Sequence, residues 1–181
     1  MRQRAARVWH AFGAAHRSTR TLGLIGVHMQ ALELKIPPPL VALLVAIGMW
    51  LVASFVPLFE LPPIVRKSVA IAMALAGGTF EIAGALSFRR ARTTINPMKP
   101  HSATALVSAG VYRVTRNPMY LGLLFILVSW AVFLSSASAL LGPLAFYLYI
   151  GRFQIAPEER VLSKLFGNEF LAYKAKVRRW L

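Results

Sequence analysis

Cysteine and aspartate are both absent from this 181-residue chain, and only 6 acidic residues are present. The lack of cysteine excludes disulfides, thiolate nucleophiles and thiolate metal sites. The 4 histidines are scattered, and His101 has no clustered partner, so we predict no bound metal. A glycine fingerprint after a strand is also missing, and nothing in the sequence predicts the sheet of a soluble dinucleotide-binding domain.

Apolar and basic residues dominate instead. Hydrophobic residues make up 57% of the chain, and 21 Lys+Arg against 6 Asp+Glu give a formal charge of +15. In a soluble protein this charge would favour nucleic acid as the partner. Here the basic residues flank apolar runs, so we predict a membrane protein that contacts anionic lipid headgroups and binds no nucleic acid.

The apolar residues fall into segments that predict an all-α, polytopic integral membrane protein. The segments are Leu40–Phe59, Val69–Phe88, Met119–Leu134 and Ala139–Phe153. The first two are about 20 residues long, enough to cross roughly 30 Å of hydrocarbon. The last two are shorter, and only Ser135–Ser138 separates them, which predicts a tight helical hairpin.

Basic residues predict the orientation. The connection Arg89–Pro118 carries many of them and no acid, so the positive-inside rule makes it a cytoplasmic loop. With four crossings both termini are cytoplasmic, and we expect a bacterial inner membrane. The tail from Pro157 has apolar residues at helical spacing and a basic face, which predicts an interfacial helix interrupted near Gly167.

The chain divides into an N-terminal arm, residues 1–28, and a membrane domain, residues 29–181. The arm is cationic and has no long apolar run, so it fits neither a signal peptide nor a span. The alternative is that the natural start is Met29, which would place the arm upstream of the protein.

An acidic residue, Glu81, lies inside the second apolar segment. Small residues before it recur every four positions and allow a neighbouring helix to approach closely: Ala70, Ala74 and Gly78. An acid in a span is by default a functional candidate. The structural alternative, which we favour slightly, is that Glu81 pairs with an arginine such as Arg89 or Arg116.

The connection "RTTINPMKPHSATALVSAG" contains two prolines and cannot form a continuous helix. An irregular loop over the membrane face offers free backbone groups to a small polar ligand, although a solvated linker fits the segment equally well.

The stretch "GVYRVTRNPMYLG" follows. Pro118 suits the first turn of a helix and Asn117 its cap. Arg113 and Arg116 add charge that could hold a carboxylate. Two tyrosines nearby could stack on a flat ring or serve as interfacial anchors: Tyr112 and Tyr120.

Further polar residues follow the fourth segment. Arg152 lies near the end of an apolar helix, and Glu158 and Glu159 follow the break at Pro157. The two acids could bind the amino group or ribose hydroxyls of a nucleoside-type ligand, or bridge to arginines of the long connection.

Three elements in this order resemble the isoprenylcysteine carboxyl methyltransferase family, specifically its small bacterial members. They are "ALVSAGVYRVTRNPMYLG", a short helical hairpin, and "PEERVLSKLFGNEFLAYKAKVRRW". The resemblance covers Pro37 to Leu181. It implies a membrane-embedded transferase that uses S-adenosylmethionine on the cytoplasmic side and a lipophilic substrate from the bilayer.

The resemblance also implies site residues. Arg152 corresponds to an arginine near the methyl acceptor and could hold an acceptor carboxylate. The cofactor-binding positions carried over from the family are Leu106, Val107, Gly110, Tyr112, Arg116, Asn117, Pro118, Tyr120, Glu158 and Glu159.

The chain departs from the eukaryotic members at two positions where they carry histidine, Thr104 and Asn117. Two other functions compete with methyl transfer. A membrane reductase of the sterol-reductase type also has an Arg-x-Pro-x-Tyr element but uses a nicotinamide cofactor, and this chain is short for that class. A non-enzymatic lipid-binding membrane subunit is the second alternative.

Overall fold

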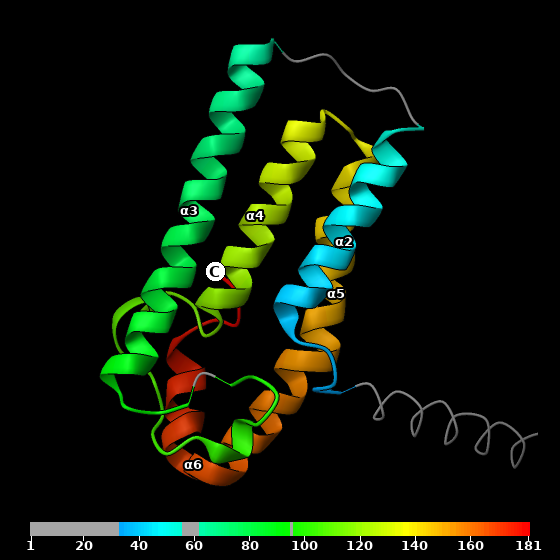
Figure 1. Ribbon diagram of the computed structural model, residues 1–181. Coiled ribbons are helices and arrows are strands. Elements are labelled where there is room, and N and C mark those ends of the chain that lie inside the picture. The colour runs from blue at the N-terminus through cyan, green and yellow to red at the C-terminus, as the bar shows by residue number, and fades with distance from the viewer. Residues whose placement is uncertain (1–32, 56–61, 95) are drawn as a thin grey trace, which may run out of the picture.

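A computed structural model describes residues 33–55, 62–94 and 96–181, and within these ranges every regular element is a helix (Figure 1). The α-helices are α2 (Pro38–Ala53), α3 (Pro63–Arg90), α4 (Pro118–Leu134), α5 (Leu141–Ile150) and α6 (Ala156–Lys176). The prediction of an all-α protein is therefore confirmed for the described residues.

Short turns join these helices. Two 3-10 turns, η1 (Pro100–Ser102) and η2 (Gly110–Arg113), interrupt the long loop between α3 and α4. A third, η3 (Ser138–Leu140), leads into α5, and a π-helical turn, η4 (Gly151–Ile155), joins α5 to α6 without a break.

Helices α2, α3, α4 and α5 stand side by side, and α6 turns away at one end of the bundle (Figure 1). The long loop lies at this same end, and the C-terminus returns to the start of α4, where the Arg116 backbone N–H donates to the Arg178 carbonyl. A core of buried side chains joins α2, α4, α5 and η4, with Met49, Leu127, Phe146, Ile150 and Ile155 at its centre.

The helix boundaries follow the chemistry predicted for them. Pro118 occupies the first turn of α4, as expected, because a proline there loses no hydrogen bond. The helix ends at Ser135, which takes a left-handed conformation with φ 52°. The predicted hairpin of the third and fourth segments is thus confirmed, since η3 and α5 follow directly.

Small residues bring α3 and α4 together, but of the predicted set only Ala70 is among the buried positions of α3. Ala70, Gly77 and Gly84 are the buried positions of α3. A Cβ built on Gly77 would lie 2.7 Å from the Gly122 carbonyl oxygen of α4, whereas one on Gly78 would meet nothing within 4 Å. The four-residue spacing that included Gly78 was therefore wrong. The contact repeats every seven residues, as in helices that pack at a small crossing angle.

Length and composition qualify two helical stretches for crossing a membrane, α3 and the continuous stretch Ser138–Lys176. At 1.5 Å per residue, the 28 residues of α3 extend about 42 Å. Helices α2 and α4 are apolar but shorter. The predicted first segment runs on to Phe59, and residues 56–61 lie outside the described residues, as do the arm and Met29.

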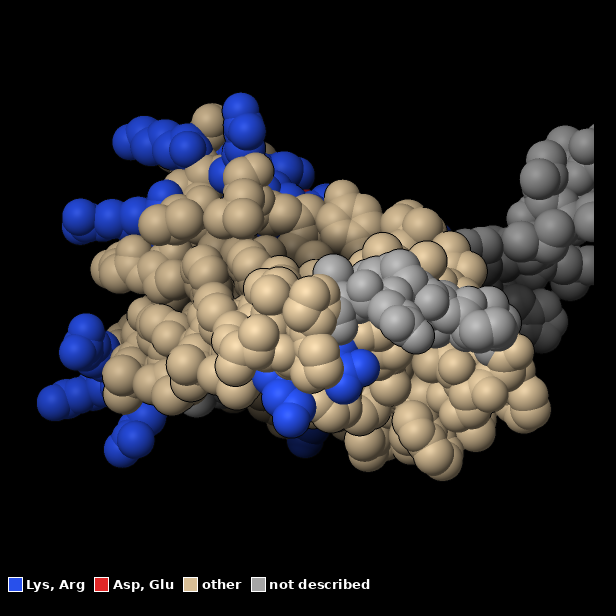
Figure 2. All heavy atoms as spheres, turned by 90° about the horizontal axis from the view of Figure 1, so that it is seen from above, with Lys and Arg blue, Asp and Glu red and all other residues tan. Residues whose placement is uncertain are grey.

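The outer faces of the bundle are apolar. Large side chains of α2 and α3 are more than half exposed: Leu43, Leu44, Ile71, Leu75 and Ile82. Viewed from the end opposite α6, the surface is mostly uncharged and basic side chains project at its margin (Figure 2). Such a surface fits contact with lipid better than contact with water.

The tail behaves as its spacing predicts. Phe170 is buried and the basic side chains of α6 are exposed, including Lys164 and Lys176. The helix breaks at Gly167, whose φ of 48° and ψ of −122° leave the helical region.

We expect Gly77→Ala to destabilise the protein by about 1–3 kcal/mol, because its new methyl group would meet the α4 backbone. Gly78→Ala makes the same change on the same helix in open space, so it should be neutral or slightly stabilising. Thermal unfolding of both variants in detergent checks this, and equal melting temperatures would contradict the close contact.

Candidate functional site

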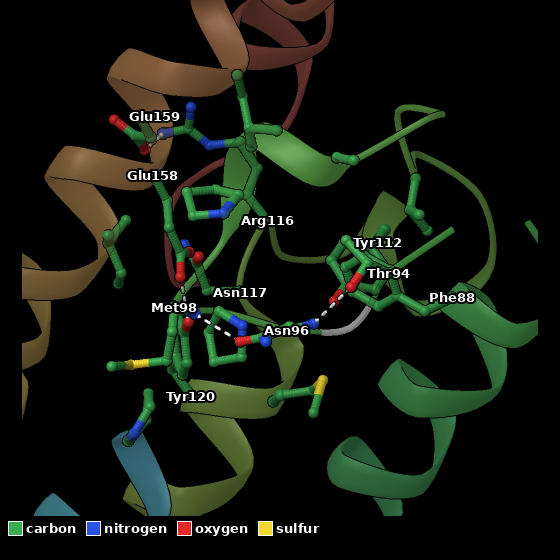
Figure 3. Close-up of a pocket in the computed structure, with 18 of the residues that line it drawn as sticks. Phe88, Thr94, Asn96, Met98, Tyr112, Arg116, Asn117, Tyr120, Glu158 and Glu159 are labelled. Carbon is green, nitrogen blue, oxygen red and sulfur yellow. Dashed lines mark hydrogen bonds and ion pairs between the residues drawn. The ribbon is translucent and has the colours of Figure 1, made fainter. Parts of the chain in front are cut away.

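A cavity of about 470 Å³ lies at the end of the bundle where the long loop and α6 meet. Its walls come from the start of α2, the second half of α3, the loop, the start of α4, and α6 (Figure 3). This volume is in the range of small-molecule sites. Apolar side chains form most of the lining, and a few polar groups converge on it.

The long loop forms one wall and is irregular, as predicted. Short local hydrogen bonds hold its shape: the Asn96 side chain accepts from the Met98 N–H at 2.9 Å, and Thr93 Oγ1 accepts from the Thr104 N–H at 3.0 Å. Thr94, Asn96 and Met98 face the cavity (Figure 3). The loop is thus part of a ligand-sized site and not a free linker.

Tyr112 is positioned by two contacts. Its ring packs edge-on against Phe88 with centroids 5.5 Å apart, and its carbonyl accepts a hydrogen bond from the Tyr173 hydroxyl at 2.7 Å. Burial raises the pKa of Tyr112 well above its usual range, so the phenol stays protonated. Gly110 begins the turn that carries it and has a φ of +64°, a conformation that glycine adopts readily.

Glu158 points into the cavity and is held by neutral donors. Its Oε1 accepts from the Tyr120 hydroxyl at 2.5 Å and from Gln154 Nε2 at 2.6 Å. The same Gln154 nitrogen donates to the Pro97 carbonyl at 2.7 Å, so one side chain ties the acid to the loop. Gln154 lies in the π-helical turn, a form of helix that is frequent at functional sites.

Glu159, the next residue, is instead surrounded by cations. Arg179 donates from Nε at 3.1 Å and from Nη2 at 2.7 Å, Arg116 Nη2 lies at 3.2 Å, and Lys174 Nζ at 3.6 Å. The hydrogen bonds to Glu159 raise the pKa of the Arg179 guanidinium, so the pair stays ionised. This cluster joins the C-terminal tail, α6 and the approach to α4.

Arg116 keeps unused donors in this cluster. Its side chain is 9% exposed, and its Nε and Nη1 are buried without a hydrogen-bond partner in the described part of the chain. Arg113 is exposed and does not line the cavity, so of the two arginines only Arg116 faces the cavity.

Most of the cofactor positions carried over from the family meet at this cavity. Only Gly110 and Pro118 do not line it; each starts a turn or helix that carries a lining residue. Those that line it are Leu106, Val107, Tyr112, Arg116, Asn117, Tyr120, Glu158 and Glu159.

The expected capping role of Asn117 was wrong. Asn117 occupies the N-cap position of α4 but makes no side-chain cap; its Nδ2 donates to the Arg179 carbonyl at 2.8 Å. The tail can accept from Asn117 because the chain becomes extended at Val177, after the end of α6. Carbonyl groups beyond that point are not used within the helix.

Arg152 lies outside the cavity lining. Its guanidinium is largely exposed and pairs with Glu33 at 3.0 Å, and Arg160 binds the same carboxylate. This placement gives no support to the expected contact between Arg152 and an acceptor carboxylate.

Glu81 lines the cavity and does not pair with Arg89 or Arg116 as we favoured. Arg116 pairs with Glu159 instead. Sequence reasoning also missed Gln154 and Asn96, because a single amide in an apolar helix or loop carries no motif. Glu81 stays the functional candidate that an acid within an apolar segment indicates.

Comparison with known families decides the class of the protein. The sequence model of phospholipid methyltransferases matches residues 65–169, which include most of α3, the loop, the hairpin and most of α6. The chain belongs to the phospholipid methyltransferase family. The resemblance to the isoprenylcysteine carboxyl methyltransferases is thereby confirmed at the level of the family.

Two relatives match parts of the chain. An uncharacterized protein of Haemophilus influenzae is 52% identical over 63 residues, 35% of this chain and 100% of that protein. Methanethiol S-methyltransferase 1 of Bradyrhizobium diazoefficiens is 41% identical over 69 residues, 37% of this chain but 22% of its own length. No solved structure matches the chain.

We expect Arg179→Ala to lower the free energy of unfolding by about 1–2 kcal/mol, since it removes two charge-assisted hydrogen bonds that are partly exposed. Arg178→Ala is the matched control, because that side chain is exposed and only its backbone carbonyl binds Arg116. Thermal unfolding of the two variants checks this, and equal losses would contradict a specific role for the Arg179–Glu159 pair.

Proposed function

We propose that this protein transfers a methyl group from S-adenosylmethionine to a lipophilic acceptor at the cytoplasmic face of a bacterial inner membrane. The observation that carries the proposal is the cavity in which Arg116 presents free N–H groups beside Glu158 and the tyrosines. Family membership supports methyl transfer as the class of reaction.

The lining residues fit the proposed cofactor. The unpaired Nε and Nη1 of Arg116 are suited to the carboxylate of the methionine part, because a guanidinium binds carboxylates through several N–H groups. Glu158 can accept from a hydroxyl or ammonium group, and Phe88 and Tyr112 offer aromatic surface for a flat ring.

When bound, S-adenosylmethionine supplies a methyl group that is already activated by a positively charged sulfur. The chain therefore has to bind and orient the two reactants and to exclude water. It needs no nucleophile or metal of its own. The apolar lining and the loop over the cavity would exclude water. Arg116 and Glu158 would orient the cofactor.

The membrane placement is part of the same proposal. Basic side chains gather where α3 ends and along α6, at the end of the bundle that holds the cavity: Arg89, Arg90, Lys164, Lys174 and Lys176. Anionic headgroups of the cytoplasmic leaflet would bind this end. Four apolar helices would then cross or enter the bilayer, with both termini cytoplasmic, and a lipophilic acceptor would reach the cavity from the bilayer.

The names of the relatives differ in the acceptor. The family description names a phospholipid, and the Bradyrhizobium protein is named for methanethiol. For this chain we therefore carry over only the class of reaction, which is methyl transfer.

Binding of S-adenosylhomocysteine to the purified protein should be in the micromolar range by calorimetry, with reduced nicotinamide dinucleotide phosphate as the comparison. Arg116→Ala should weaken this binding at least about tenfold, or 1.4 kcal/mol, because the variant removes the donors that face the ligand. The melting temperature reports whether each variant is folded.

Arg113→Ala is the matched control, since this arginine is exposed and lies off the cavity. Its affinity should stay within about twofold of the parent. Binding of the nicotinamide alone would assign the protein to the reductases, and binding of neither ligand would favour the non-enzymatic membrane subunit.

A further inference from the structure

Glu81 has a partly buried side chain that lines the cavity, and one of its carboxylate oxygens is an unused acceptor. It lies on the face of α3 that packs against α4, so close that a Cβ on Gly122 would meet its Cγ at 2.9 Å. Its Oε1 is buried without a hydrogen-bond partner, and none of the ion pairs found among the described residues includes it.

Packing alone does not account for this side chain. An unpaired buried acceptor costs about 1–3 kcal/mol, and more when it is charged. Arg116, a cation of the same cavity, contacts Glu159 through Nη2 and forms no ion pair with Glu81. The desolvation free energy of a buried acceptor on the wall of a cavity is offset when a ligand donates a hydrogen bond to it.

The surroundings of Glu81 indicate what kind of ligand that is. The α4 residues that line the cavity are Met119, Tyr120 and Leu123, and the Tyr120 hydroxyl is already donated to Glu158. The polar groups assigned above to the cofactor, Arg116 and Glu158, belong to other elements. Glu81 therefore adds one hydrogen-bond acceptor to an apolar wall, which suits a lipophilic molecule with one polar end that carries a proton.

We propose that Glu81 binds the reacting group of the methyl acceptor and takes its proton, so that the acceptor is a lipophilic molecule with a proton on the reacting atom, such as an amine or a thiol. This inference rests on the proposed function. A carboxylate acceptor, which has no such proton, would be repelled by Glu81.

The step balances without a further reactant. The lone pair of the acceptor atom forms a bond to the methyl carbon, and the carbon–sulfur bond breaks with its electron pair remaining on sulfur. The proton of the acceptor atom passes to the Glu81 carboxylate, which becomes neutral. Removal of this proton by a positioned base typically contributes a factor of about 100 to 10,000 in rate.

The test compares the parent protein, Glu81→Gln and Glu169→Gln in lipid nanodiscs loaded with S-adenosylhomocysteine. Glu169 is an exposed acid of α6 and is the matched control for the loss of one charge. The probes are octylamine, octanethiol and octanoate, and calorimetry measures their binding after subtraction of empty nanodiscs.

The parent and the control should bind octylamine at least about tenfold more tightly than octanoate. Glu81→Gln should lose this preference, while its affinity for S-adenosylhomocysteine stays within about twofold. Its melting temperature should be unchanged or higher, because the substitution removes an unpaired buried charge.

Three outcomes would overturn the inference. The first is an unchanged preference in Glu81→Gln, with normal binding of S-adenosylhomocysteine, which would leave the proposed function intact. The second is a clear loss of melting temperature in Glu81→Gln, which would make the carboxylate a structural group. The third is a parent protein that binds no S-adenosylhomocysteine, which would remove the proposed function as well.

Discussion

The close approach of the α3 and α4 backbones at Gly77 and Gly122 is the contact on which the site depends. It holds the two helices antiparallel and in register, and a buried hydrogen bond from Ser129 to the Ala70 carbonyl continues the seam. The end of α3 therefore lies beside the start of α4, and the loop that joins them must fold back over that end. The cavity is the space enclosed beneath it, and Glu81 lies on the seam that opens into it.

Two adjacent acids on the wall of the cavity, Glu158 and Glu159, have different partners. Glu158 is held by Tyr120 and Gln154, which are neutral donors, so it remains available to a ligand. Glu159 is enclosed by Arg116, Arg179 and Lys174 and joins the chain end to the rest of the site. The π-helical turn before them brings Gln154 onto both the acid and the loop. Two acids that are adjacent in the sequence thus have different surroundings, neutral donors for Glu158 and cations for Glu159.

The sequence predicted the helices well because their ends carry strong local signals, proline at the start of α4 and serine after it. It could not predict which small residue of α3 faces α4, since a helix in lipid is apolar on every side and has no polar face to orient it. It also placed Arg152 at the site. Arg152 and Glu158 are six positions apart across the π-helical turn, and only Glu158 lines the cavity. Partners far apart in sequence, such as Asn117 and the Arg179 carbonyl, had no local signal.

Arg116 and Glu81 both keep buried atoms without partners, although they carry opposite charges and line one cavity. A cavity shaped for stability alone would bring them together, because an ion pair in a low-dielectric site recovers part of the desolvation cost. Instead Arg116 pairs with Glu159, while Glu81 packs against Gly122 on the α3–α4 seam. Under the proposed function, Arg116 would hold an anionic group of one molecule and Glu81 a proton donor of the other. This is the arrangement that a transfer between two different bound molecules requires, because each must be oriented before they react.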